Sequence, residues 1–404
     1  MSLRLMGAFA SALFCCACYW SIRLAYADHL GNDRSRPTLE HAIRLAPGNP
    51  AYYVRLAEAD PGSALTAMEK AVALNPLNSD VWMEFARLAE AQKDFQRAES
   101  CLLRAVRLDR TFAPRWLLAE YYFRRHDPSR FWPAVRAALA TSYDDVAPLF
   151  DECWQLAPSP ETILQQAIPN RQDVLRQYLD YLLAKKRLDL AEPVASKVMG
   201  HAGRDDVAPL LSYCDSLLAK NQAQPALEIW NSLAKKRLLD YLALVPEKSA
   251  SITNGSFEKP FLSTAFDWRP AQLPGILARR GGAPAELRLS FSGKQPETCE
   301  ILSEFVPLAP ARKYRLSIRY ETNELERDTG LSWRVLDVLD GADLLEGTGQ
   351  LTGKERVEGE EEFVFATPAE TQLARLVLMY RRVLGTVRIT GSISLRNVRL
   401  SLVE

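Results

Sequence analysis

A repeat with a period of 34 residues constrains the fold of this chain more than any other sequence feature. Trp82 recurs as Trp116, and the block 71–76 (AVALNP) recurs as 105–110 (AVRLDR) at the same offset. A fixed period of this size is typical of stacked helical hairpins, in which each hairpin buries its apolar face against its neighbours. Proteins built in this way bind or scaffold other molecules far more often than they catalyse reactions.

The repeat places several hairpins along the first part of the chain. Residues 79–112 and 113–146 are predicted to be consecutive hairpins. Two more are predicted around 183–191 and 218–226, which recur at an offset of 35. The segment 143–171 fits least well and is predicted to hold an irregular pair, which makes five or six hairpins in all.

The repeat resembles the tetratricopeptide repeat, a family of helix–turn–helix units with Trp, Ala and Pro at set positions. The matching residues are Trp82, Ala98, Ala105, Ala64, Ala71 and Pro76. Ala86, Ala89 and Arg110 stand where the family has Gly, Tyr and Pro, so the repeats are degenerate. The small residues of the pattern would let two helices approach closely, and Asp94 would cap the second helix of its hairpin.

In that family the first helices of successive hairpins line a groove, which implies a protein partner. The positions that would face this groove are Met83, Arg87, Glu90, Leu117, Tyr121 and Arg124. Any solvated helix face has a similar composition, so the same residues also fit a plain exposed surface. A peptide-binding groove is therefore a hypothesis.

The N-terminal segment differs from the rest of the chain. Residues 5–22 carry no charge and lie between Arg4 and Arg23. As a helix, this segment would be about 27 Å long, close to the roughly 30 Å hydrocarbon core of a membrane. It is predicted to be a signal anchor that holds the chain on the inner membrane, facing the periplasm. The alternatives are a signal peptide cleaved after Ala27, which would make the chain periplasmic or secreted, and a buried soluble helix.

Composition and motifs disfavour several classes of function. The chain has 50 basic and 50 acidic residues without a concentrated basic patch, which argues against nucleic acid as a partner. The four cysteines beyond the N-terminal segment, Cys101, Cys153, Cys214 and Cys299, form no CxxC pair, and the phosphate-loop and GxSxG motifs are missing. The chain is therefore predicted not to be an enzyme, and no catalytic cofactor is expected.

From residue 246 onward the helical spacing stops, and short segments of alternating apolar and polar residues begin. Residues 314–320 (YRLSIRY) are one example. About eight such segments, separated by turns, predict an antiparallel β-sandwich. The chain is thus predicted to be an α+β multidomain protein, with an N-terminal hydrophobic helix (1–27), a helical repeat domain (28–245) and a jelly-roll sandwich (248–404).

Three motifs in this last part resemble galactose-binding-like jelly rolls, the fold of many carbohydrate-binding modules. They are 254–258 (NGSFE), 314–320 and 395–400 (LRNVRL). The resemblance implies the sandwich fold and a sugar ligand. Members of this family often hold a structural calcium ion. Glu258 and Asn397 stand at the matching positions, although Asn397 replaces the usual Asp.

A sugar site needs flat aromatic faces for stacking and planar polar groups for the hydroxyls. The residues predicted to supply them are Asp267, Trp268, Arg319, Arg334 and Tyr380. The two arginines lie opposite the apolar side of their strands and are expected to form a charged cluster on one sheet face. Trp333 shares the apolar face of its strand with its neighbours, which favours core packing. For Trp268, in a predicted loop, the sequence leaves both a ligand contact and a core position open.

Together these features predict a non-enzymatic adaptor or scaffold of the cell envelope. It would hold a protein on the helical repeats and a glycan on the sandwich, in surface-polysaccharide assembly or export, by analogy at the level of the fold. One alternative is a scaffold whose sandwich binds protein or only caps the repeats. Another is a glycoside hydrolase with two catalytic carboxylates. The sandwich offers Asp267, Glu300, Glu304, Glu321 and Asp337, among which the sequence selects no pair.

Overall fold

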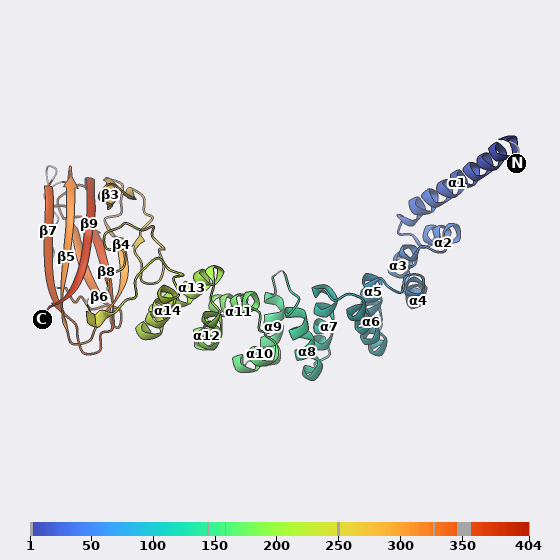
Figure 1. Cartoon of the computed structure of the whole chain (residues 1–404), viewed down its shortest axis with the longest axis horizontal. Helices are drawn as coiled ribbons and strands as arrows, with labels where there is room; N and C mark the ends of the chain where they lie inside the picture. Colours follow the sequence, from blue (N-terminus) through green and yellow to red (C-terminus); the bar gives the residue numbers. More distant parts are fainter. Residues whose placement is uncertain are drawn as a thin grey trace. The chain divides into compact units, whose positions relative to one another are not determined.

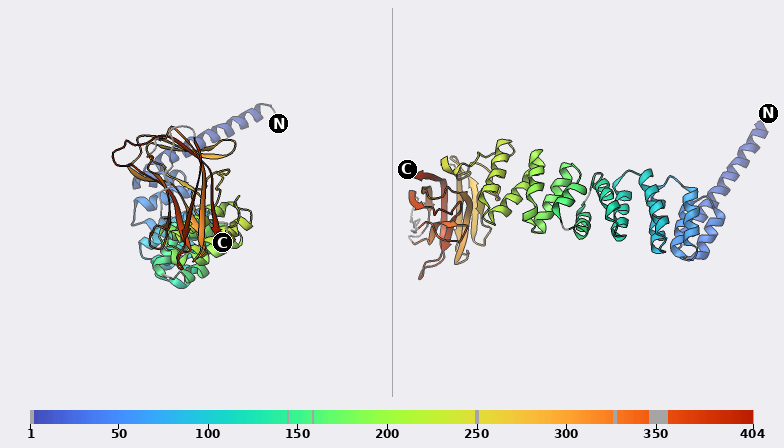
Figure 2. Two further views of the ribbon diagram at one scale, coloured as in Figure 1. Left: turned by 90° about the vertical axis from the view of Figure 1, so that its left-hand side faces the viewer. Right: turned by 90° about the horizontal axis from the view of Figure 1, so that it is seen from below.

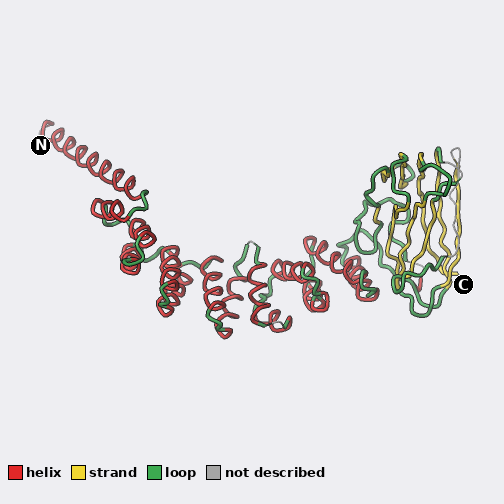
Figure 3. Tube along the Cα trace, turned by 180° about the vertical axis from the view of Figure 1, so that it is seen from behind, coloured by secondary structure: helices red, strands yellow, loops and turns green. Residues whose placement is uncertain are grey.

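The structure, a computed structural model, describes residues 3–143, 145–157, 159–248, 251–325, 328–345 and 357–403. They fall into two compact units, Met1–Val174 and Leu175–Glu404. Helices make up the first unit and the beginning of the second, and strands follow in the remainder of the second unit (Figure 3). The predicted fold class, a helical repeat region followed by an antiparallel sandwich, is confirmed.

The first unit consists of helices that pair into hairpins stacked one after another (Figures 1 and 2). Its hairpins α3/α4, α5/α6 and α7/α8 include the two predicted from the 34-residue period. The predicted irregular segment holds the short helices α9 and α10. The elements are α1 (Leu3–Gly31), α2 (Arg36–Leu45), α3 (Pro50–Ala59), α4 (Ala64–Leu74), α5 (Ser79–Ala91), α6 (Phe95–Leu108), α7 (Phe112–Arg124), α8 (Pro128–Leu139), α9 (Ala147–Leu156) and α10 (Pro160–Gln166).

Local sequence explains where these helices begin and how closely they pack. Asp94 accepts a hydrogen bond from the backbone N–H of Arg97 at the start of α6, as predicted. Asn78 and Asp127 cap α5 and α8 in the same way. Ala98 and Ala105 on α6 are completely buried. Because their side chains are small, α5 and α6 can approach each other closely.

Helix α1 has the length and composition needed to cross a membrane. Its apolar side chains, Phe14 and Ile22 among them, are exposed, so the interpretation as a buried soluble helix is wrong for this unit. The last turns of α1 pack on the first hairpin. Ala27 is buried in a cluster with Ala42 and Tyr52, and the Tyr52 hydroxyl donates to the carboxylate of Asp28.

The second unit begins with helices. Helix α11 (Gln172–Ala184) spans the boundary between the units and is followed by η1 (Leu188–Leu190), α12 (Glu192–Gly200), η2 (Arg204–Asp206), α13 (Val207–Leu218), α14 (Ala223–Lys235) and η3 (Pro246–Lys248). Helices α13 and α14 form a hairpin. Ala226, expected at a helix crossing, is completely buried.

The strands form two antiparallel sheets that pack face to face. One sheet has the order β1-β4-β8-β6 and the other the order β2-β3-β9-β5-β7. Alternation along each strand gives one buried and one outer face, as in β6, where every second residue is buried. The strands are β1 (Arg269–Pro270), β2 (Ile276–Gly281), β3 (Glu286–Ser292), β4 (Thr298–Pro307), β5 (Lys313–Asn323), β6 (Leu331–Asp337), β7 (Val357–Ala366), β8 (Leu373–Arg381) and β9 (Thr390–Val403).

The α13/α14 hairpin and the sandwich are packed together within the second unit. The indole of Trp230 on α14 lies 5.9 Å from the ring of Phe266 and 5.4 Å from the ring of Tyr241. Asp215 on α13 accepts hydrogen bonds from the Thr264 hydroxyl and from the guanidinium of Arg269. The compact unit that contains the sandwich starts at Leu175 and so includes this hairpin, while the domain boundary at 245–248 stays a prediction.

Candidate binding surfaces

The first helices of successive hairpins bring together two of the six residues predicted to face a groove. Arg124 on α7 contacts Glu90 on α5 through two hydrogen bonds of 2.9 Å, from Nε and Nη2. Its guanidinium also lies 3.7 Å from Glu120, whose carboxylate accepts a hydrogen bond of 2.6 Å from the Trp116 indole N–H. An arginine between two glutamates thus links α5 to α7.

A third carboxylate extends this cluster to the next first helix. The pKa of Glu152 on α9 is raised to about 7, chiefly by burial and also by the charge of Glu120, while Arg124 acts in the opposite direction. Its Oε2 atom is buried and has no hydrogen-bond partner in the described part of the chain. We call Glu90, Trp116, Glu120, Arg124 and Glu152 the first-helix strip. With three carboxylates and one guanidinium, the strip is acidic.

Sequence reasoning missed three members of this strip. Trp116 was noted only as a repeat marker, and Glu120 lies 34 positions after the buried Ala86, so the period gave no signal for an accessible residue there. Glu152 falls in the irregular segment, where no periodic signal could locate it.

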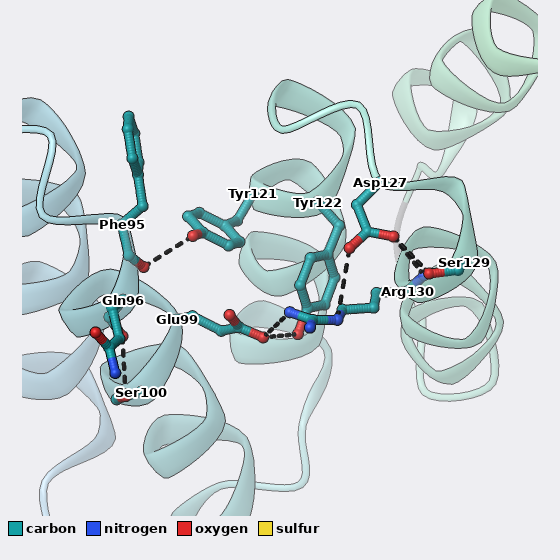
Figure 4. A network of polar contacts seen from close by, with 9 residues as sticks. All are labelled: Phe95, Gln96, Glu99, Ser100, Tyr121, Tyr122, Asp127, Ser129 and Arg130. Carbon is teal, nitrogen blue, oxygen red and sulfur yellow. Dashed lines mark hydrogen bonds and ion pairs between the residues drawn. The ribbon is translucent and has the colours of Figure 1, made fainter.

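Two of the predicted groove residues are corrected, because the structure buries them. Leu117 packs inside the unit, and Tyr121 is buried with its hydroxyl donating to the backbone carbonyl of Phe95 over 2.8 Å (Figure 4). Met83 is half-buried. Arg87 is exposed and pairs with Glu84 of its own helix at 2.8 Å. For these last two, a contact with a partner stays a prediction.

A polar network beside Tyr121 holds this end of α7 against its neighbouring helices (Figure 4). Glu99 on α6 accepts hydrogen bonds from the hydroxyl of Tyr122, at 2.9 Å, and from Arg130 on α8, at 2.6 Å. Burial and the bond to Glu99 raise the pKa of Tyr122 to about 12. Asp127 accepts from the Ser129 hydroxyl and pairs with Arg130. The network joins α6, α7 and α8.

In the sandwich, three of the five predicted sugar-binding residues are corrected. Trp268, Asp267 and Tyr380 have no exposed surface. The Trp268 indole donates to the Thr253 carbonyl over 2.9 Å, and its ring lies 6.3 Å from that of Trp333 in the core. Of the two positions that the sequence left open for Trp268, a ligand contact or the core, the structure shows the core.

Asp267 belongs to a buried polar cluster, not to a ligand site. It accepts a hydrogen bond of 3.1 Å from the Tyr241 hydroxyl, and burial raises its pKa. Burial also raises the pKa of Glu304 well above its usual value, and Glu304 accepts from the backbone N–H and the hydroxyl of Thr253. Tyr380 accepts a hydrogen bond from the backbone N–H of Ile389. All these contacts tie loops to the sandwich core.

The expected cluster of Arg319 and Arg334 on one face is also wrong. Arg319 lies on β5 of the five-stranded sheet, whereas Arg334 lies on β6 of the four-stranded sheet, so they occupy opposite outer faces. Arg334 pairs with Asp343 at 2.7 Å beside a hollow of about 590 Å³. Arg319 lies 3.4 Å from Glu360 and lines a hollow of about 710 Å³.

The two residues named for calcium lie in different surroundings. Asn397 lines the same hollow as Arg319, whereas Glu258 is exposed and does not line it. Within the described ranges, no group of three or more His, Cys, Asp or Glu side chains could hold a metal ion. A calcium site stays a prediction that rests on the resemblance.

Comparison with known proteins agrees with the class of fold. Residues 55–120 match the family model of the tetratricopeptide repeat. The comparison with curated proteins gave no match. The helical part of the chain is therefore described as tetratricopeptide-like, on the basis of its repeat and its hairpins.

Solved structures resemble the two parts of the chain separately. "CBM4 structure and function" is 14% identical, with a TM-score of 0.30, over 38% of this chain and 100% of that chain. "YrrB: a TPR protein with an unusual peptide-binding site" is 14% identical, with a TM-score of 0.23, over 49% of this chain and 91% of that chain. The Pseudomonas aeruginosa protein pilF is 15% identical, with a TM-score of 0.25, over 55% and 90%. These likenesses concern the fold alone.

Proposed function

We propose that this chain is a non-enzymatic adaptor of the cell envelope. Helix α1, including residues 5–22, anchors it in the inner membrane with the remaining chain in the periplasm. The helical hairpins bind a protein partner, and the sandwich binds a glycan. Surface-polysaccharide assembly or export would use such a combination of modules.

The observation that carries the protein-binding part is the first-helix strip. Arg124 is shared by Glu90 and Glu120, so the strip holds more negative than positive charge. Glu152 adds a buried carboxylate oxygen that no described group satisfies. A lysine or arginine of a partner would complement the accessible carboxylates of Glu90 and Glu120, because a charge-assisted hydrogen bond is among the stronger polar contacts. The partner segment is therefore expected to carry basic side chains.

A peptide-display selection on the full-length chain in detergent tests this part. We expect the wild type to enrich peptides that contain Lys or Arg, and Glu120→Gln/Glu152→Gln to lose that enrichment. Glu69→Gln is the matched control, since Glu69 is an exposed glutamate on α4, the second helix of its hairpin. Enrichment of peptides without basic residues, or equal enrichment by the double variant, would refute this mode of binding.

A scaffold without a glycan ligand is the alternative, and the packing of α13/α14 on the sandwich favours it as a second candidate. In that case the sandwich would stabilise the last hairpin and bind no sugar. A panel of neutral and acidic polysaccharides, tested with the full-length chain by affinity electrophoresis, separates the two. Retardation by any member of the panel supports the adaptor, and no retardation supports the scaffold.

The hydrolase interpretation is supported least, because its carboxylates serve structural contacts. Asp267 and Glu304 are buried in the Thr253 cluster, and Glu300 pairs with Arg375. Glu321 pairs with Arg396, and Asp337 accepts from Thr371. A glycosidase needs two carboxyl groups that flank an accessible bond. Release of reducing ends from a polysaccharide by the purified chain would overturn the non-enzymatic proposal.

A further inference from the structure

The outer face of the five-stranded sheet carries three arginines on neighbouring strands. Arg315 and Arg319 lie on β5, directly opposite Ser401 and Asn397 of β9. Arg399 on β9 lies opposite Ser317, the residue midway between the two β5 arginines. Residues diagonal to each other on adjacent antiparallel strands are about 7–8 Å apart, which is within reach of long side chains. The three arginine side chains can therefore contact one extended ligand.

Only two of these arginines have an acidic neighbour. Arg315 lies 3.6 Å from Glu362 and Arg319 lies 3.4 Å from Glu360, both glutamates being on β7. Arg399 is exposed and forms no ion pair with any residue that the structure describes. Its position is diagonal to those of Arg315 and Arg319, whose charges are compensated by the two glutamates. The centre of this face thus presents an exposed guanidinium that is available to an anion.

The arginines line a formed hollow of about 710 Å³. One wall is the segment 252–256, whose Gly255 carbonyl accepts a hydrogen bond of 2.9 Å from the backbone N–H of Val398. A Cβ atom at Gly255 would lie 2.2 Å from the Val398 carbonyl oxygen, so this approach requires glycine. Ser317, Asn397 and Ser401 add hydroxyl and amide groups to the lining. The hollow is therefore preformed and lined by polar groups.

The lining contains no aromatic side chain among the described residues. Neutral sugars bind largely by stacking on aromatic faces, and this hollow offers none. Guanidinium groups instead recognise carboxylate, sulfate or phosphate oxygens through paired hydrogen bonds. Glu360 and Glu362 also line the hollow, where they pair with Arg319 and Arg315, so the three arginines leave one positive charge in excess, at Arg399, and this charge favours an anion.

The spacing of the arginines favours a polymer with successive anionic groups as the ligand. Arg315 and Arg319 are four residues apart on one strand, which corresponds to about 13.6 Å at roughly 3.4 Å per residue. A single phosphate or sulfate is too small to contact both, whereas successive charged units of a polymer can. From these observations we infer that the outer face of β5 and β9 binds an acidic polysaccharide, with Arg399 as the central anion contact. This inference rests on the proposed glycan-binding role of the sandwich and names its ligand class.

The test compares two forms of one polysaccharide with the full-length chain in detergent. Polygalacturonate carries a carboxylate on every sugar, and its methyl ester has the same backbone without the charge. We expect the wild type to bind polygalacturonate at least tenfold more tightly than the ester, and added salt to weaken this binding. Arg399→Gln is expected to reduce the affinity about tenfold, since a hydrogen bond to a charged group is worth roughly that factor.

Arg279→Gln is the matched control, because Arg279 is an exposed arginine on β2 of the same sheet that does not line the hollow. It is expected to bind polygalacturonate like the wild type. Equal binding of both polysaccharide forms, with no effect of Arg399→Gln, would overturn the acidic ligand and leave a neutral glycan role standing. If neither form binds, the inferred acidic ligand is wrong. If no member of the wider polysaccharide panel binds either, the sandwich has no glycan-binding role. Inhibition by inorganic phosphate at equal anion concentration would overturn the polymeric ligand.

Discussion

Arg124 of α7 and Glu90 of α5 form a two-bonded ion pair, and they are 34 positions apart, so the pair joins equivalent sites of successive hairpins. An exposed ion pair contributes about 0.2–1 kcal/mol, and two parallel bonds favour the upper part of this range. A double-mutant cycle of Glu90→Gln and Arg124→Gln is therefore expected to give a coupling energy of about 0.5–1 kcal/mol. Native-state hydrogen exchange of the amides in α5 and α7 measures it. A coupling indistinguishable from zero would show that the two hairpins are joined by apolar packing alone.

Glu152 should make the first unit less stable at alkaline pH. Its folded-state pKa of about 7 lies above the ordinary value of 4.5, so the folded chain holds a proton that the unfolded chain releases. This stabilising contribution is complete below about pH 4.5 and is lost as the pH rises toward 7. Glu152→Gln removes the titration and should raise the stability at pH 8 by about 1 kcal/mol, after allowance for solvent screening.

Thermal unfolding of the wild type and of Glu152→Gln at pH 5 and pH 8 checks this expectation. The difference in Tm should be larger at pH 8. Arg124→Gln should enlarge the effect, because Arg124 lowers the pKa of Glu152. If the difference in Tm is the same at both pH values, Glu152 does not titrate as its burial indicates.

Periodic signals predicted the parts of the fold in which each residue's surroundings repeat. The 34-residue period located α5 to α8, and Asp94 capped α6 because a free N–H at a helix start attracts a nearby carboxylate wherever the helix lies. Alternation along β5 and β6 separated the buried from the outer side of each strand. These outcomes depend on local chemistry, which one sequence contains.

The site residues depended on tertiary arrangement, which one sequence does not contain. Alternation showed that Arg319 and Arg334 point away from the core, but it could not assign their strands to different sheets. Trp268 lies in a loop, and whether a loop residue is buried depends on where the loop packs. Arg399 was part of a recognised motif, yet its lack of a carboxylate partner followed only from the register of β9 against β5.

Gly31, at the end of α1, should be needed for the packing of this helix on the first hairpin. A Cβ atom there would lie 2.6 Å from the ring of Tyr52, which is almost completely buried. Gly31→Ala should therefore destabilise α1 to α3 by about 1–2 kcal/mol, although alanine is the better helix former. Gly48→Ala is the control, since a Cβ atom at Gly48 meets nothing within 4 Å. Hydrogen exchange in α2 and α3 measures both, and equal protection in the two variants would contradict the packing.

The final hairpin should stabilise the sandwich, because the two share buried contacts. Trp230 on α14 is completely buried against Phe266 and Tyr241, and Asp215 on α13 compensates the charge of Arg269, whose pKa burial lowers. Trp230→Ala should cost about 3–5 kcal/mol, as expected for a large buried aromatic side chain. Asp215→Asn should cost about 1–3 kcal/mol by leaving a buried guanidinium without its carboxylate.

The measurement is the protection of the strand amides from hydrogen exchange. These amides lie in a different part of the sequence from the substituted helices, so a change there reports on the contact between hairpin and sandwich. Both variants should increase hydrogen exchange in β4 and β8 of the full-length chain, whereas Trp230→Phe, which keeps an aromatic ring at this position, should do so less. A fragment starting at Leu175 should resist proteolysis better than one starting at residue 248, because only the longer fragment keeps the α13/α14 contacts. If Trp230→Ala leaves the strands fully protected, the hairpin and the sandwich fold independently, and the shorter fragment should then be as resistant as the longer one.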